Sequence, residues 1–208
     1  MLFAVKQIKN NPIDSNCYII TNDKSCVIVD PGSEKAEEII ETVEDFAAIP
    51  EYIILTHEHF DHIWACDKLR KEFGCKLICS SVCADDIVNS KKNFSLFYNG
   101  KGFVLNKADI ILDEDNLEMT LGGIDFEFIM TPGHTNASIS FLCGNYLFTG
   151  DTLIKGIRTV TKLYTGSKSA LKNSIEKINA LKGNNYTVCP GHGEMFGLDD
   201  YDTNIALK

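Results

Sequence analysis

Short apolar runs alternate with helical stripes of apolar residues along most of the chain. Stripes at three- and four-residue spacing predict helices that follow Ser33, reach Phe73 and run over 168–182. We expect Ser33 to cap the first helix, and Gly74 and Gly183 to end the other two. The short apolar runs predict strands at 17–20, 26–29, 52–56, 76–80 and 186–189.

Two β-hairpins are predicted in the second half of the chain. Pairs of apolar runs flank Gly122-Gly123 and Gly144-Asn145, residue types that tight hairpin turns favour. These runs lie at 117–120, 124–130, 138–143 and 146–149. Residues 84–109 form the least regular segment, with a loop expected at 93–102. Strands followed by a covering helix in each half predict one mixed α/β (α+β) domain over residues 1–208, with two packed sheets and outer helices in four layers.

Composition and charge are those of an ordinary globular protein. The chain has 208 residues, of which 44% are hydrophobic and 24% charged, as expected for about one domain. The net charge of −9 argues against a nucleic-acid partner, which needs a basic surface. Apolar runs fall far short of the ~18 residues that span a membrane, and residues 1–10 lack the apolar core of a signal peptide. We therefore expect a cytoplasmic protein with no membrane partner; the sequence leaves the oligomeric state open.

The eight cysteines are expected to be reduced thiols that pack as small hydrophobes. Several fall inside predicted strands, and cytosolic proteins rarely form disulfides. Cys75, Cys79 and Cys83 recur every four residues, but the segment lacks the Cys-x2-Cys spacing of zinc and iron–sulfur sites. A metal cluster at these three positions is therefore disfavoured.

All five histidines lie in loops that follow predicted strands. His134 follows Pro132-Gly133, His192 follows Pro190-Gly191, and the other three occur in Thr56-His57-Glu58-His59-Phe60-Asp61-His62. Asp151 also stands just past a strand, after Gly150. Neutral imidazole and carboxylate are the ligands of borderline divalent ions. The gathering of every histidine in such positions favours a metal site over unrelated structural roles.

Spacing divides these residues into two ligand groups for two divalent ions. Alternate residues of an extended loop can point the same way, so the first ion would bind His57, His59 and His134. The start of the next helix points at a second place, so the second ion would bind Asp61, His62 and His192. Asp151 has two carboxylate oxygens and could bridge the ions, which would share a hydroxide at neutral pH.

Three neighbours of these residues are not expected to be ligands. Glu58 alternates away from the two flanking histidines, so we expect it to be solvated or bonded to the backbone. Phe60 and Trp64 are expected to pack beside the site.

The order and spacing of these motifs resemble the metallo-β-lactamase superfamily. The resemblance rests on His57-x-His59-x-Asp61-His62 followed by His134, Asp151 and His192, and on Val29-Asp30-Pro31-Gly32 at the end of an early strand. It covers nearly the whole chain. The family implies the metallo-β-lactamase fold, an αββα sandwich with a dinuclear, usually zinc, site at one edge. Zinc is therefore the expected metal, with iron and manganese as alternatives.

Within this superfamily, the chain most resembles glyoxalase II-like hydrolases (hydroxyacylglutathione hydrolases), which cleave thioesters of glutathione. β-Lactamases of the superfamily place cysteine or serine near the position of Asp151 and are exported. The chain departs from the glyoxalase II pattern in the spacing of Gly156-Ile157-Arg158-Thr159, in Val160 where an acid is common, and in Asn136-Ala137 where Pro-Gly is usual. The printed sequence ends at Lys208 without the C-terminal helical domain that grips glutathione, so we expect a short, single-domain member.

The resemblance implies a metal-dependent hydrolase of a thioester such as S-lactoylglutathione, or of a related acyl-thiol or ester. Asp61 is expected to orient the nucleophile as well as to bind metal. Arg158 and Tyr164 are weaker candidates for substrate binding, because a solvated loop position explains them equally well. The alternatives are a lactonase or small phosphodiesterase on the same site, a metal protein without turnover, and a mononuclear iron persulfide dioxygenase using His57, His59 and His134.

Overall fold

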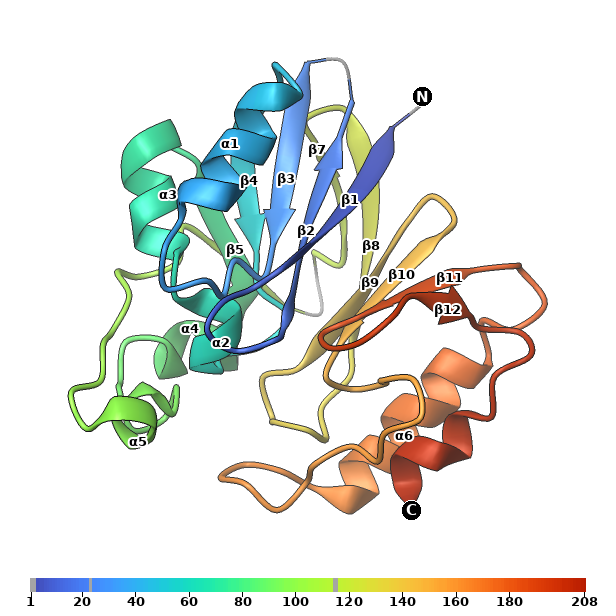
Figure 1. Ribbon diagram of the computed structural model, residues 1–208. Coiled ribbons are helices and arrows are strands. Elements are labelled where there is room, and N and C mark those ends of the chain that lie inside the picture. The colour runs from blue at the N-terminus through green and yellow to red at the C-terminus, as the bar shows by residue number, and fades with distance from the viewer. Residues whose placement is uncertain (1–2, 23, 114–115) are drawn as a thin grey trace.

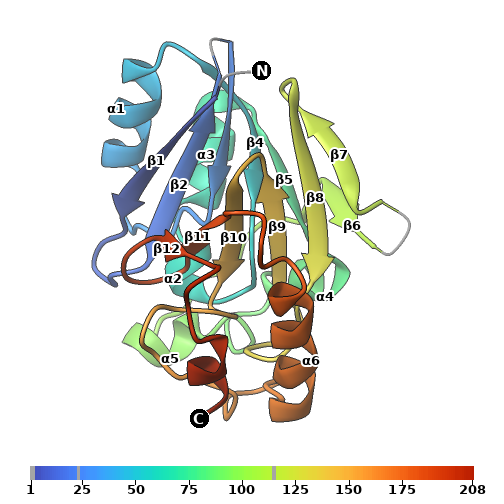
Figure 2. The same cartoon turned by 90° about the vertical axis from the view of Figure 1, so that its right-hand side faces the viewer.

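Two six-stranded sheets face each other and carry helices on their outer faces (Figures 1 and 2). The computed structural model describes residues 3–22, 24–113 and 116–208. The sheet orders are β1-β2-β3-β4-β5-β6 and β12-β11-β10-β9-β8-β7, so each sheet comes from one half of the chain. The predicted four-layer αββα sandwich is confirmed.

The first half of the chain forms one sheet and five helices. Its strands are β1 Ala4–Lys9, β2 Asn16–Thr21, β3 Ser25–Val29, β4 Ile49–Ile54, β5 Lys76–Ser80 and β6 Ile110–Leu112. Its helices are α1 Glu37–Asp45, α2 Phe60–Ile63, α3 Cys66–Phe73, α4 Ser81–Asp86 and α5 Ser95–Asn99. The two longest of these helices, α1 and α3, cover the outer face of the first sheet (Figure 1).

The second half forms the other sheet, with both predicted hairpins in place. Its strands are β7 Glu118–Leu121, β8 Ile124–Met130, β9 Ile139–Cys143, β10 Tyr146–Gly150, β11 Thr187–Pro190 and β12 Phe196–Gly197. Its helices are α6 Lys168–Asn179 and a 3-10 helix, Thr203–Leu207. The β7–β8 and β9–β10 pairs are antiparallel, as tight hairpins require.

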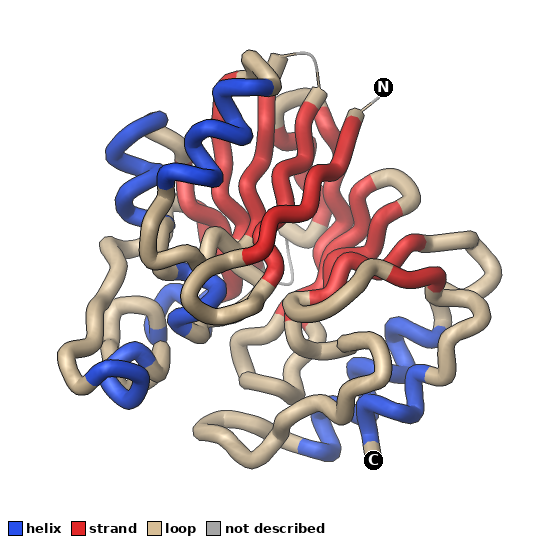
Figure 3. Tube along the Cα trace, viewed as in Figure 1, coloured by secondary structure: helices blue, strands red, loops and turns tan. Residues whose placement is uncertain are grey.

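Strand direction brings several loops to one edge of the sandwich. β3, β4 and β5 are parallel neighbours, and β10 and β11 form a parallel pair in the other sheet. At this edge the two sheets are joined, because the Ile139 amide donates to the Thr56 carbonyl over 2.9 Å. The loops that follow β3, β4, β8, β10 and β11 gather here (Figure 3).

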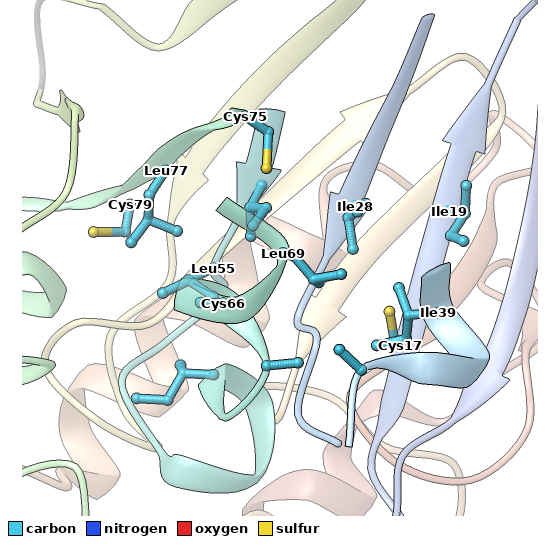
Figure 4. Close-up of a cluster of buried hydrophobic side chains, with 14 of the residues drawn as sticks. Cys17, Ile19, Ile28, Ile39, Leu55, Cys66, Leu69, Cys75, Leu77 and Cys79 are labelled. Atoms are coloured by element: carbon cyan, nitrogen blue, oxygen red, sulfur yellow. The ribbon is translucent and has the colours of Figure 1, made fainter. Parts of the chain in front are cut away.

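Three apolar clusters fill the spaces between the four layers. The outer cluster of the first half packs Ile39 of α1 and Leu69 of α3 over the first sheet (Figure 4). The central cluster lies between the sheets and includes Ile54 and Phe141. The third packs Ile175 of α6 against the second sheet. Burial on both faces explains why the strands read as continuous apolar runs rather than as alternating ones.

Three local predictions are wrong. Ser33 does not cap α1, which begins at Glu37; its hydroxyl instead accepts from the Asn11 amide and donates to Asn10. The helix expected to reach Phe73 is two helices, α2 and α3, separated at Trp64 and Ala65. The loop expected at 93–102 contains α5, which is too short to show a helical stripe in the sequence.

Within the described ranges, every helix falls short of the combined length and apolar character that crossing a bilayer requires.

We expect the cysteines of the folded protein to resist thiol reagents. All eight are unpaired and buried, as the sequence predicts, and burial raises the pKa of Cys26 and of Cys143 to about 12. A thiol that is both inaccessible and protonated reacts slowly, because the thiolate is the nucleophile. Titration with Ellman's reagent at pH 8 should label at most one thiol rapidly in the native protein and eight after unfolding. Two or more rapidly labelled native thiols would contradict this packing.

Candidate metal centre

The candidate ligands follow strand ends at the shared edge of the two sheets. His57 and His59 lie in the loop after β4, and α2 begins immediately afterwards with Asp61 and His62 inside it. His134 lies in the loop after β8, Asp151 directly follows β10, and His192 follows β11 by two residues. The strand ends are fixed by sheet hydrogen bonds, so these loops present their side chains from a rigid base.

The first predicted group comes together as three facing imidazoles. His57, His59 and His134 each offer a nitrogen, and these atoms lie within 4.8 Å of one another. His59 Nδ1 and His134 Nε2 are 3.1 Å apart. His57 Nε2 is buried and has no hydrogen-bond partner. Three converging nitrogen donors match the ligand chemistry of zinc and similar divalent ions.

The second predicted group lies beside the first. Asp61, His62 and His192 also place one ligand atom each within 4.8 Å of the others. Asp61 Oδ2 is 3.4 Å from His192 Nε2 and 3.7 Å from His62 Nε2. This set supplies two imidazoles and one carboxylate.

The Asp151 carboxylate lies between the two groups. Its Oδ2 is 3.6 Å from both His134 Nε2 and His192 Nε2, and its Oδ1 is 3.6 Å from His62 Nε2. This is the position that the sequence predicts for a bridging ligand. Gly191 permits it, since a Cβ there would stand 2.1 Å from Asp151 Oδ1.

Several buried atoms of the candidate ligands have no hydrogen-bond partner among the residues that the structure describes. These atoms are His57 Nε2, His59 Nε2, His62 Nε2 and Asp151 Oδ1. Buried polar atoms in folded proteins nearly always have a partner. Cations held by the two groups would satisfy this donor set, so the residues present fit a pair of divalent metal ions.

The outer nitrogens of the histidine rings are held by hydrogen bonds. His134 Nδ1 donates to the Val160 carbonyl over 2.8 Å, and His192 Nδ1 donates to the Asp14 carbonyl over 2.7 Å. His62 Nδ1 lies 3.0 Å from a carboxylate oxygen of Asp30. A carbonyl can only accept, so the Nε2 atoms of His134 and His192 are left free for a metal, as in known metal sites.

Burial keeps part of the first group neutral. Burial and the neighbouring histidines lower the pKa of His57 well below its usual range, and burial with His134 lowers that of His59 to about 3. Both rings are therefore unprotonated at neutral pH, which is the state that binds metal.

In the second group, interactions between carboxylates and imidazoles outweigh the effect of burial on the pKa values. Burial lowers the pKa of His62, but Asp61, Asp151 and Asp30 outweigh that effect and raise it to about 10. Burial alone would raise the pKa of Asp61. The neighbouring His62 and His192 have the larger combined effect and lower this pKa below its usual range, so the carboxylate is ionised. An ionised carboxylate among imidazoles favours a bound cation.

Asp30 is the functional residue whose role the sequence analysis did not assign. Its Oδ1 accepts from the Thr56 amide over 2.8 Å, and its Oδ2 accepts from the Thr56 hydroxyl over 2.6 Å and faces His62 Nδ1. Asp30 also places a ligand atom within 4.8 Å of His57 and His62. Because both of its oxygens already accept hydrogen bonds, we assign it the role of positioning His62. The sequence did contain a signal for this role: Asp30 is an acidic residue directly after a buried strand and before Pro31-Gly32.

Glu58 corrects another expectation. It belongs to neither ligand group, as predicted, but it is buried rather than solvated. Its carboxylate accepts a hydrogen bond from the side-chain hydroxyl of Thr135 over 2.9 Å, whereas a backbone partner was expected. Burial raises the pKa of Glu58 to about 7.

Arg158 and Tyr164 lie outside the metal-ligand groups. Both side chains are exposed, and Arg158 lines a separate pocket of about 160 Å³ together with Lys168 and Lys172 of α6. A role for either residue in substrate binding stays a prediction. The loop that carries them nevertheless reaches the centre through the Val160 carbonyl, which holds His134.

Two protein relatives resemble the chain along most of its length. A probable metallo-hydrolase of Bacillus subtilis, YqgX, is 30% identical over 200 residues, which cover 95% of this chain and 94% of that protein. A hydroxyacylglutathione hydrolase of Salmonella arizonae is 29% identical over 180 residues. That match covers 86% of this chain but only 62% of the hydrolase.

Two solved structures share the fold. The crystal structure of BLEG-1, named a B3 metallo-β-lactamase, matches with a TM-score of 0.88 and 32% identity, covering 94% of each chain. TTHA1623 in a di-iron-bound form matches with a TM-score of 0.77 and 25% identity, covering 93% of this chain and 94% of that one.

A family model agrees with the geometry of the centre and with these relatives. The model of the metallo-β-lactamase superfamily matches residues 10–192, a range that contains every candidate ligand from His57 to His192. The chain therefore belongs to the metallo-β-lactamase superfamily, whose members include metal-dependent hydrolases.

Proposed function

We propose that this protein hydrolyses thioesters, and that its two ligand groups would hold divalent metal ions that supply hydroxide at neutral pH. The observation that carries the proposal is the pair of complete ligand groups with the Asp151 carboxylate between them. The similarity to hydroxyacylglutathione hydrolase supports a thioester as the substrate. S-Lactoylglutathione is the first substrate to test.

The reaction adds hydroxide to the carbonyl carbon and breaks the carbon–sulfur bond. The thiolate leaves with the bonding electron pair, and the acid product releases a proton at neutral pH. When bound, the two ions would lower the pKa of a shared water and stabilise negative charge on the carbonyl oxygen. A thiolate is a stable leaving group, so the chain needs no strong general acid beside the sulfur.

Asp61 supplies the orienting group in this proposal. Its carboxylate is ionised, lies 3.4 Å from His192 Nε2, and is 14% exposed toward the site. An ionised carboxylate at this place accepts a hydrogen bond from the attacking oxygen and fixes its direction.

A β-lactam is the second candidate substrate, because BLEG-1 is named a B3 metallo-β-lactamase and matches 94% of this chain. Hydrolysis of its amide would use the same nucleophile but would expel a nitrogen, which needs a proton. We favour the thioester, since the thiolate leaves without one.

Metal content and stability test the dinuclear arrangement. We expect two metal equivalents per chain after reconstitution, and about one in His59→Ala and in His192→Ala, because each variant removes a ligand from one group. Ions that bind only the folded protein raise its melting temperature, so chelation should lower it. Elemental analysis and calorimetry on zinc-, iron- and manganese-loaded protein would measure both effects. One equivalent in the wild type, unchanged in His192→Ala, would indicate the mononuclear alternative.

The Asp61→Asn variant tests the proposed role of the carboxylate. The amide is similar in size but uncharged, so we expect kcat for S-lactoylglutathione to fall by about 10²–10⁴-fold. Thiol release gives the rate, and elemental analysis shows whether metal is retained. Asp45→Asn, on the exposed end of α1, is the matched control and should keep full activity. Full turnover by metal-loaded Asp61→Asn would refute the role. Cleavage of a chromogenic cephalosporin with no thioester turnover would instead support the β-lactam.

A further inference from the structure

We infer that the preferred substrates carry a large apolar acyl group, which lies against an apolar rim beside the metal centre. The inference rests on the proposed thioester hydrolysis and names the class of acyl group. The apolar rim consists of six residues on two segments: Phe94, Phe97, Tyr98, Val160, Leu163 and Tyr164. Phe94 is half-buried, and the other five are exposed large hydrophobic side chains.

The first segment of the apolar rim begins on a candidate metal ligand. The Phe94 ring packs edge-on against His59, with ring centroids 4.9 Å apart. Phe97 continues outward from Phe94, with centroids 5.8 Å apart, and is 68% exposed. Aromatic surface that extends from a buried ligand into solvent is suited to an apolar ligand.

The backbone at Phe94 is held in a strained conformation. Its φ is +63° and its ψ is −1°, in the left-handed region that a bulky residue rarely adopts. The neighbouring Asn93 fixes this turn: its side chain donates to the Phe103 carbonyl over 2.9 Å, accepts from the Ser95 amide over 2.9 Å, and is fully buried. Strain maintained by such anchors is concentrated at functional sites. Here it aims the Phe94 ring at His59.

An aromatic platform supports the first segment from behind. Trp64 stacks on Phe103 with centroids 5.2 Å apart, and Tyr98 of α5 packs against Trp64 at 5.7 Å and Phe60 at 4.9 Å. α5 therefore has little freedom to collapse over the metal centre. The rim is a preformed surface, which lowers the entropic cost of binding.

The second segment of the apolar rim begins at a residue that holds another candidate ligand, His134. Val160 is 51% exposed, and its carbonyl holds His134. Tyr164 is 61% exposed, and Leu163 beside it is 40% exposed. Both views show α5 and this loop below the same edge of the sandwich (Figures 1 and 2). The two segments therefore adjoin the first ligand group at two residues, Phe94 beside His59 and Val160 beside His134.

The acyl group is the part of a thioester that fits this surface. Biological thiol carriers are polar and usually charged, so they gain little from contact with aromatic rings. An aliphatic or aromatic acyl chain gains roughly three- to fourfold in binding for each methylene buried. The rim should therefore discriminate by acyl length.

The first test uses metal-loaded protein and acyl-glutathiones that share one thiol and differ in the acyl group. We expect kcat/KM to rise about threefold per methylene from acetyl to hexanoyl. Phe94→Ala and Phe97→Ala should reduce the hexanoyl-to-acetyl ratio at least fivefold. Phe97 is exposed, so its replacement leaves the fold intact. Val104→Ala is the matched control, since Val104 is 54% exposed in the same part of the chain but outside the rim.

The second test needs no turnover. Trp64 is the only tryptophan in the chain and contacts Tyr98 of the rim, so its fluorescence should report ligands there. Hexanoate should bind at least tenfold more tightly than acetate to the wild type and to Val104→Ala. In Phe97→Ala this preference should largely disappear.

The outcomes separate this inference from the proposed function. Preferential hexanoate binding without hydrolysis of any thioester overturns the proposed function and supports the apolar rim. Thioester hydrolysis independent of acyl length, with equal binding of hexanoate and acetate, supports the proposed function and overturns the rim. A length preference that survives in both phenylalanine variants also overturns it.

Discussion

The geometry of the centre depends on one buried carboxylate, that of Asp30. It accepts two hydrogen bonds from Thr56 at the end of β4 and faces His62 Nδ1 over 3.0 Å. It thereby joins the end of β3 to the loop and helix that carry four of the candidate ligands. Because the group is 2% exposed, leaving it unpaired would be costly, so the three elements are held together.

Close approach of the backbone completes this arrangement. Gly32 lies so near the Asp61 carbonyl that a Cβ would overlap it, at 1.5 Å. The turn after β3 is therefore in direct backbone contact with α2, the helix that contains Asp61 and His62. The ligand groups are consequently built from rigid strand ends and one close turn-to-turn contact, which is the kind of support that a metal site needs to hold its geometry.

The sequence predicted most of the fold and the grouping of the candidate ligands, because the signals concerned were local. Apolar runs located β2 to β5 and β7 to β11, apolar spacing located α6, and Gly122-Gly123 and Gly144-Asn145 located the hairpins. The six-residue strand β1 was missed, because polar residues are interspersed among its apolar ones. Short elements such as α5, and the start of α1, could not be predicted, because tertiary contacts decide them: Ser33 bonds to Asn10 and Asn11 instead of capping. The role of Asp30 and the burial of Glu58 depend on partners distant in sequence, Thr56 and Thr135, which periodicity does not reveal.

The candidate metal ligands and the apolar rim lie on different kinds of structure. Strand ends fix the ligand groups, whereas the apolar rim is carried by the long segments between β5 and β6 and after β10. These segments touch the ligands at two points, Phe94 on His59 and the Val160 carbonyl on His134. Both points lie on the same ligand group. The Phe60 amide, next to Asp61, also donates to the Asn93 carbonyl over 2.9 Å. A change in backbone at Phe94 or Val160 would therefore reach the first group, and one at Asn93 would reach the second.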